Sequence, residues 1–440
     1  MDIKIPDDVL YIIEGLEGAG FGAYAVGGCV RDSLLGKAPK DWDVCTSALP
    51  RQVLECFKGH RAIETGLKHG TVTIVNGAFP VEVTTYRIDG DYSDNRRPDS
   101  VEFTDTLRED LSRRDFTINA MACNPKAGIV DYFDGMGDLG AGRIRCVGDP
   151  GTRFQEDALR IMRALRFAAA LGFSIDAATG DAMYEKRELL GNISVERIAG
   201  ELNKMIVGEN LYPLMSSHMA IITEIIPELA PMIGFEQNNP FHCYDVMTHT
   251  LRSVDSAPKD VQLRLTMLFH DVAKPLRHSE KDGVGHFYGH PRAGSDMARA
   301  ILRRLKYDND TIETVTQLIL YHDADVLPRR KNIKRWLNRI GEGRFRQLVK
   351  IKTADAMAQT PAAREEKTAL LERVLIVLDE ILEQQLCFSL KDLAVDGRDL
   401  ISAGVPEGVA VGRILNRLVD MVIDEQIENE KDALLEAAKQ

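Results

Sequence analysis

The sequence predicts an α+β protein, with a mixed α/β head over residues 1–150 and an all-helical remainder. Strand and helix signals alternate in the head, whereas apolar residues recur at helical spacing through most of the later chain. The turn-forming run Asp149-Pro150-Gly151 lies between the two patterns. We therefore place the first domain boundary there, in a chain of 440 residues that is long enough for several domains.

The elements of the head follow one another in short segments. A helix is expected over residues 7–16, whose apolar residues fall on one side, and GAYAVGG and DWDVCT then predict two strands. A helix follows in TSALPRQVLECF. Two alternating runs meet near Asn76-Gly77, which predicts a hairpin. The polar residues 87–106 are expected to form a long mobile loop. This order predicts a small domain with a mixed sheet.

Helical periodicity then continues to the C-terminal region. It covers the segments 154–170, 194–206, 218–227, 243–256, 260–271, 292–306, 310–320, 364–384 and 409–438. We divide this part into a helical neck and body over 151–235, a histidine-rich segment over 236–360 and a helical tail over 361–440.

The composition is that of an ordinary globular protein, with 44% hydrophobic and 28% charged residues. No apolar run is long enough to span a bilayer, and the first residues lack the basic start of a signal peptide, so a cytoplasmic location is expected. The 7 cysteines form no CxxC pair, which argues against a disulfide framework and a cysteine zinc site. Each cysteine is expected to be a small buried residue.

The net charge of -12 by itself argues against nucleic-acid binding, but the charges are unevenly distributed. Residues 328–352 carry ten Lys or Arg and one Glu. A basic patch of that density can bind phosphates even on an acidic protein. A solvated helix face explains the same segment equally well.

Asp41 and Asp43 are separated by one residue on a predicted strand, which places both carboxylates on one face. Two adjacent oxygen donors can chelate Mg²⁺, which can activate a hydroxyl and stabilise a leaving pyrophosphate. If the DxD pattern stood alone, two solvent-facing aspartates that bind no metal would be its ordinary explanation. The preceding VGGCVRD favours the metal site, because Gly27-Gly28 lets backbone N–H groups approach a phosphate whose oxygens Arg31 can bind.

Further motifs follow in order, namely RRDFTINAMA, DYFDG, EDALRIMRALRFA and VERIAGEL. Together with GGCVRD and DWD they resemble the class II tRNA nucleotidyltransferases, the CCA-adding enzymes of bacteria, and the related poly(A) polymerases. The match covers roughly the first half of the chain. The resemblance implies a polymerase-beta-type nucleotidyltransferase head followed by an elongated all-α neck, body and tail.

The same resemblance assigns roles to individual residues. Asp41 and Asp43 would hold Mg²⁺, with Glu82 on the strand PVEVTTY as a third catalytic carboxylate. Asp157 and Arg160 would read the base. The other implied contacts, to the triphosphate, the ribose or the base site, are Gly28, Arg31, Arg113, Arg114, Asp115, Arg163 and Arg166.

A physical argument supports base reading by Asp157 and Arg160, which lie three residues apart on a predicted helix and are therefore neighbours on one face. Asp accepts hydrogen bonds and Arg donates them. Such a pair matches the exocyclic amine and ring acceptor of cytosine and adenine, whereas uracil and guanine present a carbonyl there. A surface ion pair is the alternative, and Arg163 and Arg166, which extend the charged stripe, favour base reading.

The loop over 87–106 fits an enzyme that selects C first and A later, because such selection requires a moving part. In the family that this sequence resembles, a flexible loop provides this moving part. Arg96, Arg97 and Asp99 are the residues of interest in this loop, and its presence argues against an enzyme that adds only CC.

A second candidate site lies in the segment 242–322, which holds 7 of the 10 histidines. The order H…HD…D resembles HD-type metal-dependent phosphohydrolases and implies an inserted HD domain that binds a divalent metal such as Mn, Ni, Fe or Mg. The expected ligands are His249, His270, Asp271 and Asp355, with His290 and His322 where members with a second metal have further ligands. A structural remnant or an RNA-docking surface is the alternative. Surface or local hydrogen-bonding roles are expected for His242, His278 and His286.

The sequence thus predicts addition of CCA to the 3′ end of tRNA from CTP and ATP, with Mg²⁺ as cofactor and the helical body contacting the acceptor arm. Addition of A alone or of a poly(A) tail is the runner-up. An HD-domain phosphohydrolase with a vestigial head and an RNA-binding chaperone are alternatives of other classes.

Overall fold

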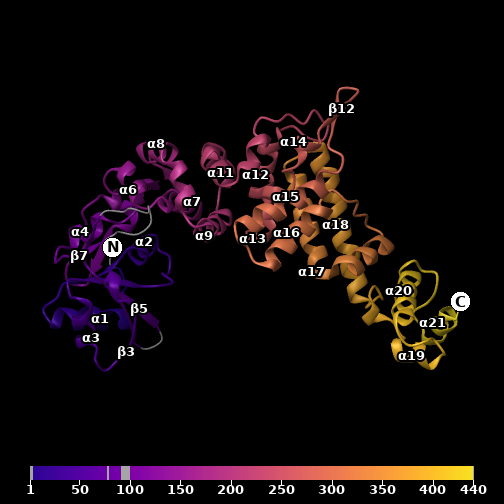
Figure 1. Ribbon diagram of the computed structural model, residues 1–440, viewed down its shortest axis with the longest axis horizontal. Coiled ribbons are helices and arrows are strands. Elements are labelled where there is room, and N and C mark those ends of the chain that lie inside the picture. Colours follow the sequence, from indigo (N-terminus) through magenta and orange to yellow (C-terminus); the bar gives the residue numbers. More distant parts are fainter. Residues whose placement is uncertain (1–2, 77–78, 91–99, 440) are drawn as a thin grey trace. The chain divides into compact units, whose positions relative to one another are not determined.

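The computed structural model describes residues 3–76, 79–90 and 100–439 (Figure 1). Its contacts divide the chain into two compact units, residues 1–227 and 228–440. The first unit contains the predicted head and most of the predicted neck. The predicted loop residues Arg96, Arg97 and Asp99 lie outside the described residues, as does Gly77 of the predicted hairpin. Within the described ranges, no helix combines the length and the apolar character needed to cross a bilayer.

A mixed sheet forms the centre of the first unit, and seven of the described strands belong to it. In the order in which they lie side by side, the strands are β3 (Arg61–Gly66), β4 (Thr71–Asn76), β5 (Phe79–Thr85), β2 (Asp43–Thr46), β1 (Ala23–Val26), β8 (Met121–Asn124) and β9 (Gly128–Asp131). The β2–β5 pair is parallel and the other neighbours are antiparallel. The prediction of an α/β head with a mixed sheet is confirmed.

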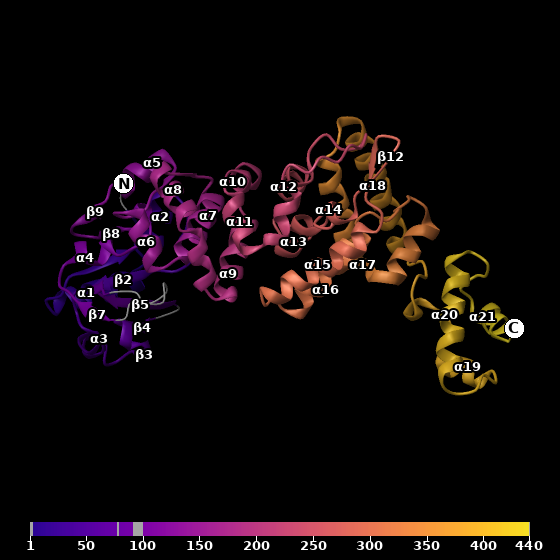
Figure 2. The ribbon, with the colours of Figure 1, turned by 45° about the horizontal axis from the view of Figure 1, so that its top comes forward.

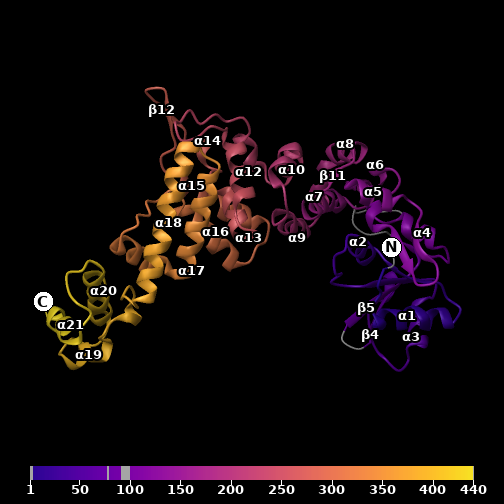
Figure 3. The ribbon, with the colours of Figure 1, turned by 180° about the vertical axis from the view of Figure 1, so that it is seen from behind.

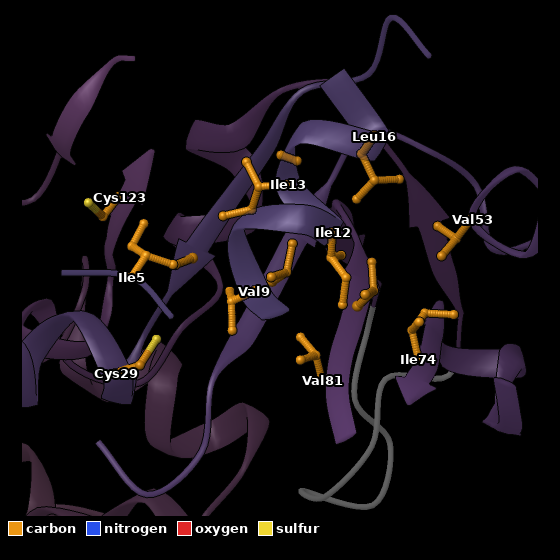
Figure 4. Close-up of a cluster of buried hydrophobic side chains, with 14 of the residues drawn as sticks. Ile5, Val9, Ile12, Ile13, Leu16, Cys29, Val53, Ile74, Val81 and Cys123 are labelled. Atoms are coloured by element: carbon orange, nitrogen blue, oxygen red, sulfur yellow. The ribbon is translucent and has the colours of Figure 1, made fainter. Parts of the chain in front are cut away.

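The helix α1 (Asp7–Gly18) builds the core on one side of this sheet (Figure 4). Its buried residues Val9, Ile12, Ile13 and Leu16 follow helical spacing and share one cluster with strand and helix residues. Among the cluster members from other elements are Val53, Ile74 and Val81. The short helices α2 (Gly28–Leu34) and α3 (Pro50–Cys56) complete this part.

The ends of the predicted loop 87–106 are strands, which corrects the prediction of irregular structure there. The segments β6 (Arg87–Asp89) and β7 (Val101–Phe103) pair antiparallel. Both strands are only three residues long, which is too short a run for their alternating pattern to be recognised.

The remaining elements of the first unit are mostly helical. They are α4 (Leu107–Ser112), η2 (Thr117–Asn119), α5 (Gly135–Ala141), β10 (Arg143–Ile144), α6 (Pro150–Glu156), α7 (Leu159–Leu171), β11 (Ser174–Ile175), α8 (Ala177–Glu185), η3 (Arg187–Asn192), α9 (Val195–Ile206), α10 (Leu211–Ser217), α11 (Met219–Ile225) and η4 (Pro227–Met232), which crosses into the second unit.

The single helix predicted over 154–170 is wrong, because the chain breaks between α6 and α7. Asp157 has extended backbone angles, and its carboxylate accepts a hydrogen bond from the backbone N–H of Leu159. An Asp that bonds its own backbone two residues ahead offers the chain an alternative to continuous helix. This break positions Asp157 outside the helix that carries Arg160.

The second unit is helical apart from one hairpin (Figures 2 and 3). Its elements are α12 (Val246–Ser256), α13 (Val261–Phe269), α14 (Lys274–Arg277), β12 (Ser279–Lys281), β13 (Val284–His286), α15 (His290–Arg304), α16 (Asn309–Tyr321), α17 (Arg330–Met357), α18 (Pro361–Glu383), η5 (Leu390–Asp392), α19 (Gly397–Ser402), α20 (Val409–Ile423) and α21 (Lys431–Ala438). The helix predicted over 409–438 is therefore two helices. Gly341 has a left-handed φ of 73° and kinks α17.

The cysteines are mostly buried, as expected, but Cys243 is exposed and Cys56 is half-buried. All seven are free thiols.

Candidate active site and a second cluster of metal ligands

Three carboxylates meet at one end of the parallel strand pair. Asp43 is the first residue of β2 and lies in register with Glu82 of β5. Asp41 precedes the strand, so the prediction that both aspartates lie on it is wrong, although the two charges still interact. Asp43 is exposed at this edge of the sheet, but partial desolvation of its carboxylate by the surrounding protein, followed by repulsion from Glu82 and Asp41, raises its pKa to about 6. Clustered oxygen donors that repel one another suit a divalent cation.

The glycine turn places a cation beside this cluster. Gly27 has a φ of 83°, and a Cβ there would lie 3.0 Å from Nη1 of Arg114. A side chain at Gly27 would therefore displace Arg114, whose positive charge lowers the pKa of Asp43 against the other effects. Gly28 opens α2, and Nη2 of Arg31 lies 3.8 Å from the position of a Cβ on it.

A buried aspartate holds the arginines of the RRD motif. Asp110 is fully buried and lies 2.8 Å from Arg113 and 3.4 Å from Arg114. Burial alone would raise the pKa of Asp110, but Arg114 and Arg113 outweigh it and lower the pKa. Arg113 also lies 3.6 Å from Asp89, at the end of β6.

Asp115 belongs to a chain of polar contacts that links the glycine turn to α7. Its Oδ2 accepts hydrogen bonds from Nε and Nη2 of Arg163 at 2.8 and 2.5 Å, and Asn119 donates to its Oδ1. Asn119 in turn accepts a 2.7 Å hydrogen bond from Arg31. Burial would raise the pKa of Asp115, but Arg163 holds it at about 2. The structure thus brings the predicted residues Arg31, Asp115 and Arg163 together.

The predicted geometry, with Asp157 and Arg160 as neighbours on one helix face, is wrong because Asp157 lies before α7; base reading by these two residues stays a prediction. Arg160 is 8% exposed and donates to Glu156 at 2.6 Å and to the carbonyl of Arg113 at 3.0 Å. Asp157 instead pairs with Arg197 of α9 at 3.1 Å. The side chains of Asp157 and Arg160 therefore have different partners, although the backbone N–H of Arg160 donates to the carbonyl of Asp157 at 3.0 Å.

Arg197, within the motif VERIAGEL, is therefore a candidate site residue to which sequence reasoning gave no role. It stands forty residues from Asp157 in a different helix, so no local spacing signals the pair. Its Nη1 is buried with no hydrogen-bond partner among the described residues. Asp157 and Arg197 together present an acceptor beside an available donor.

The histidines of the second unit form two adjacent ligand groups. Among the described residues these are His249, His270 and Asp355 in one group and Asp271, His290 and His322 in the other, with the ligand atoms of each group within 4.8 Å of one another. The two groups bring all the predicted ligands together, including the two proposed for a second metal.

Hydrogen bonds orient all four imidazole rings of these groups. The Nδ1 atom of each ring lies 2.6–3.1 Å from a backbone carbonyl oxygen. The pairs are His249 with Ala358, His270 with Met267, His290 with Phe287, and His322 with Ile319. A carbonyl only accepts hydrogen bonds, so each Nδ1 carries a proton and Nε2 is the nitrogen left for a metal. The Nε2 atoms lie 3.4 Å apart in the first group and 3.2 Å apart in the second.

Asp271 stands between the two groups. Its Oδ2 lies 3.1 Å from Nε2 of His270, and its Oδ1 lies 3.5 Å from Nε2 of His290. Burial would lower the pKa of His270, but Asp271 and Asp355 outweigh it and raise the pKa to about 10. The two carboxylates therefore stabilise a positive charge beside His270. A divalent cation can provide that charge in place of the proton on His270.

A cavity of about 350 Å³ opens onto the ligand groups. Its lining includes His242 and Lys274, which sequence reasoning did not place in the site, and Lys367. Nζ of Lys274 lies 2.7 Å from Asp271, three residues earlier, a spacing that could have revealed it. The sequence predicts a surface or local hydrogen-bonding role for His242; the residue is half-buried and packs edge-on against His249 with ring centroids 4.7 Å apart, so a surface role alone does not describe it.

The basic segment 328–352 makes many ion pairs within the second unit. Its pairs are Arg330 with Glu380, Lys331 and Arg335 with Asp424, and Arg346 with Glu342 and Asp379. Lys352 donates to two backbone carbonyls. These contacts favour the helix-face explanation for part of the segment, and phosphate binding by the rest stays a prediction.

Known protein families match three parts of the chain. The "Poly A polymerase head domain" matches residues 23–145, the "Probable RNA and SrmB- binding site of polymerase A" matches 172–232, and a tRNA nucleotidyltransferase domain 2 matches 292–438. The resemblance of the histidine groups to HD-type phosphohydrolases stays a prediction.

Similar proteins cover nearly the whole chain. The CCA-adding enzyme of Lactiplantibacillus plantarum is 34% identical over 436 residues, 97% of this chain and 94% of the relative, and that of Levilactobacillus brevis is 36% identical over 97% of this chain and 96% of the relative. The crystal structure of Bacillus stearothermophilus CCA-adding enzyme in complex with CTP is 29% identical, with a TM-score of 0.68 over 98% of this chain and 96% of that one.

A more distant structure shows the same fold. The Thermotoga maritima CCA-adding enzyme complexed with tRNA_CCA has 18% identity and a TM-score of 0.63, and the match covers 100% of this chain and 96% of that one. The relatives above 30% identity, aligned from end to end, show that the chain belongs to the CCA-adding enzyme family of nucleotidyltransferases.

Proposed function

We propose that the protein adds CMP, CMP and AMP to the 3′ end of tRNA, from CTP and ATP and without a nucleic-acid template. The observation that carries the proposal is the register of Asp43 with Glu82 on adjacent parallel strands, with Asp41 and Arg114 beside them. The relatives named CCA-adding enzyme and the similar structure with CTP support the substrates. A cytoplasmic location is part of the proposal, since this reaction uses tRNA and nucleoside triphosphates.

The carboxylates of Asp41, Asp43 and Glu82 would hold Mg²⁺, which supplies charge stabilisation at the reacting phosphate when it is bound. Arg31, Arg113 and Arg114 would bind and orient the triphosphate. The terminal 3′-hydroxyl of tRNA then attacks the α-phosphorus in line, its proton leaves to a nearby base, and pyrophosphate departs. Positioning by fixed cations lowers the barrier without protein covalent chemistry.

The proposal is tested by extending tRNA that lacks its 3′ end with one nucleoside triphosphate at a time. CTP alone should add two nucleotides, and ATP should add one only after both C residues are present. Growth of a long tail with ATP alone would support the poly(A) alternative, and no addition with any nucleotide would support a vestigial head.

Base selection should depend on the pair of Asp157 and Arg197. Arg197→Ala is expected to reduce the preference for CTP over UTP roughly tenfold, because hydrogen bonds between charged groups contribute about 1.5–3 kcal/mol. Single-nucleotide kcat/KM values with CTP and UTP measure this. Arg187→Ala, which removes an arginine paired with Glu224 in the same unit, is the matched control. Unchanged selectivity in Arg197→Ala would exclude base reading by this pair.

Binding of Mg²⁺ should weaken in acid because of the raised pKa of Asp43, about 6. Above this value the carboxylate is ionised, and below it a proton competes with the metal, so the apparent Mg²⁺ affinity should fall about tenfold per pH unit. Mg²⁺ titrations of nucleotide addition from pH 5 to pH 8 measure the effect. An affinity that is equal at pH 5 and pH 7 would contradict the assignment of Asp43.

A second function is favoured by the four oriented imidazoles. We propose that the groups around Asp271 hold two divalent ions, with Asp271 as the shared ligand, and hydrolyse a phosphate ester. Imidazole and carboxylate ligands suit transition metals such as Mn, Ni or Fe, and Mg²⁺ is the alternative. Lys274 and Lys367, which line the adjacent cavity, would bind the phosphate oxygens.

A further inference from the structure

Three arginines near the proposed nucleotide site surround one aromatic ring, that of Phe167 in α7. The guanidinium carbon of Arg166 lies 4.0 Å from the ring centroid, that of Arg31 lies 5.2 Å away and that of Arg163 lies 5.4 Å away. A cation within about 6 Å of an aromatic face is attracted by the negative charge of that face. The ring of Phe167 therefore attracts all three groups.

The position of the ring is itself well defined. Phe167 is 5% exposed, and the fully buried Phe116 packs against it at a centroid distance of 5.7 Å and an interplanar angle of 80°. Edge-to-face packing places the positive edge of one ring against the negative face of another. The ring is thus a rigid support rather than a mobile side chain.

Arg31 comes from α2, whereas Arg163 and Arg166 lie on α7 with Phe167 itself, and each arginine has its own carboxylate. Arg31 of α2 pairs with Asp32 at 2.7 Å, Arg163 with Asp115 at 2.5 Å, and Arg166 with Glu201 of α9 at 3.1 Å. Asp115 and Asn119 link Arg163 to Arg31, and α7 carries both Arg163 and Arg166, but none of the three carboxylates is the ion-pair partner of all three arginines. Phe167 is the feature that these pairs share.

Crowding of three cations costs free energy. Burial lowers the pKa of Arg166, and the charges of Arg163 and Arg31 lower it further, against the opposing effects of Glu201 and Asp115. A polyanionic triphosphate would relieve this repulsion, but the arginines must be held together before it arrives for binding to be rapid and tight. Preassembled contacts avoid the entropy cost of ordering side chains during binding.

We propose that Phe167 is a positioning residue that holds Arg31, Arg163 and Arg166 together for the incoming CTP or ATP. The inference rests on the proposed function of the head. An aliphatic side chain could fill the same volume, but its lack of a negative face would leave the three cations without a common attraction. The role of Phe167 is therefore electrostatic as well as apolar.

Stepwise fluorination of the ring tests this directly, because fluorine withdraws charge from the aromatic face with little change in size. Phe167 is replaced in the full-length protein by mono-, di- and trifluorophenylalanine. Dissociation constants for CTP are measured by calorimetry and thermal midpoints by calorimetric scans. CTP affinity should fall with each fluorine, by roughly tenfold at three, and the thermal midpoint should fall only slightly, because the ring attracts the arginines in the free protein as well. The same series at Phe345, a fully buried ring of the second unit, is the control and should leave CTP affinity unchanged.

CTP affinity that does not respond to fluorination at Phe167 would overturn the inference. So would a loss of affinity confined to variants that are partly unfolded at the temperature of the measurement, because that would show a packing role alone. The turnover number for nucleotide addition, measured on the same proteins, reports separately on the proposed function. A wild-type protein that binds CTP but adds no nucleotide would contradict the proposed function. The CTP dissociation constants of the fluorinated proteins would still test the role of Phe167.

Discussion

Asp43→Ala is expected to reduce the addition of every nucleotide by at least about 10³-fold, because loss of a metal ligand removes several kcal/mol of transition-state stabilisation. The residue stands where β2 begins, opposite Glu82, so its carboxylate is central to the anionic cluster. Binding of tRNA should persist, since removal of a negative charge does not weaken contacts with phosphates. Single-turnover addition and filter binding of tRNA measure the two effects.

Protein stability should be retained in this variant, which makes the result interpretable. The raised pKa of Asp43 shows that partial desolvation and repulsion disfavour its ionised form in the folded protein. At neutral pH the substitution therefore removes an unfavourable charge, and the thermal midpoint should not fall. Asp105→Ala, at an exposed aspartate of the same unit, is the matched control. Asp43→Ala with ordinary addition rates would exclude the carboxylate cluster as the reaction centre.

Asp271→Ala is expected to remove both metal ions from the second unit and to abolish phosphate-ester hydrolysis, while nucleotide addition remains. The two oxygens of Asp271 face different histidine pairs, so its loss affects both groups. Metal content by atomic emission and hydrolysis of an aryl phosphate measure the effects. The variant also leaves the buried Lys274 without this partner, which can cost about 3–5 kcal/mol of folding stability.

His290→Asn separates metal loss from unfolding, because it changes a ligand of one group and spares Asp271. It should lose about one of two bound ions, since a metal that loses one of a few ligands is bound far more weakly. His218→Asn, at a histidine of the first unit that bonds the carbonyl of Leu214, is the control. Wild-type protein with no bound transition metal after incubation with Mn²⁺, Ni²⁺ or Fe²⁺ would contradict the second site.

The sequence predicted which residues come together in the two candidate sites better than it predicted how those residues are arranged. The order of motifs identified Asp41, Asp43 and Glu82, and the α/β head, because alternating apolar residues mark strands of a half-buried sheet. Periodicity could not reveal that α6 ends at Glu156, since the apolar stripe continues across the break. The cap made by the side chain of Asp157 decides that boundary, and such a bond leaves no periodic signal.

Contacts that no periodic pattern signals were the other source of error. Arg197 reaches Asp157 from α9, and His242 reaches His249 through a turn that precedes α12. One sequence contains no measure of such distances. The histidines of the second cluster could be chosen as candidate ligands because imidazole and carboxylate residues in the order of a known metal site are chemically distinctive, whereas a pairing of Arg with Asp is common throughout proteins.

The central claim is that Asp43 holds a metal ion for nucleotidyl transfer, and Asp43→Cys tests it most directly. A thiolate binds Mg²⁺ poorly and softer ions well. Addition of CMP to tRNA lacking its 3′ end should be lost with Mg²⁺ and recovered with Cd²⁺ or Mn²⁺, while the wild type prefers Mg²⁺. Full activity of Asp43→Cys with Mg²⁺, or no recovery with any softer ion in a folded protein that still binds tRNA, would contradict the account.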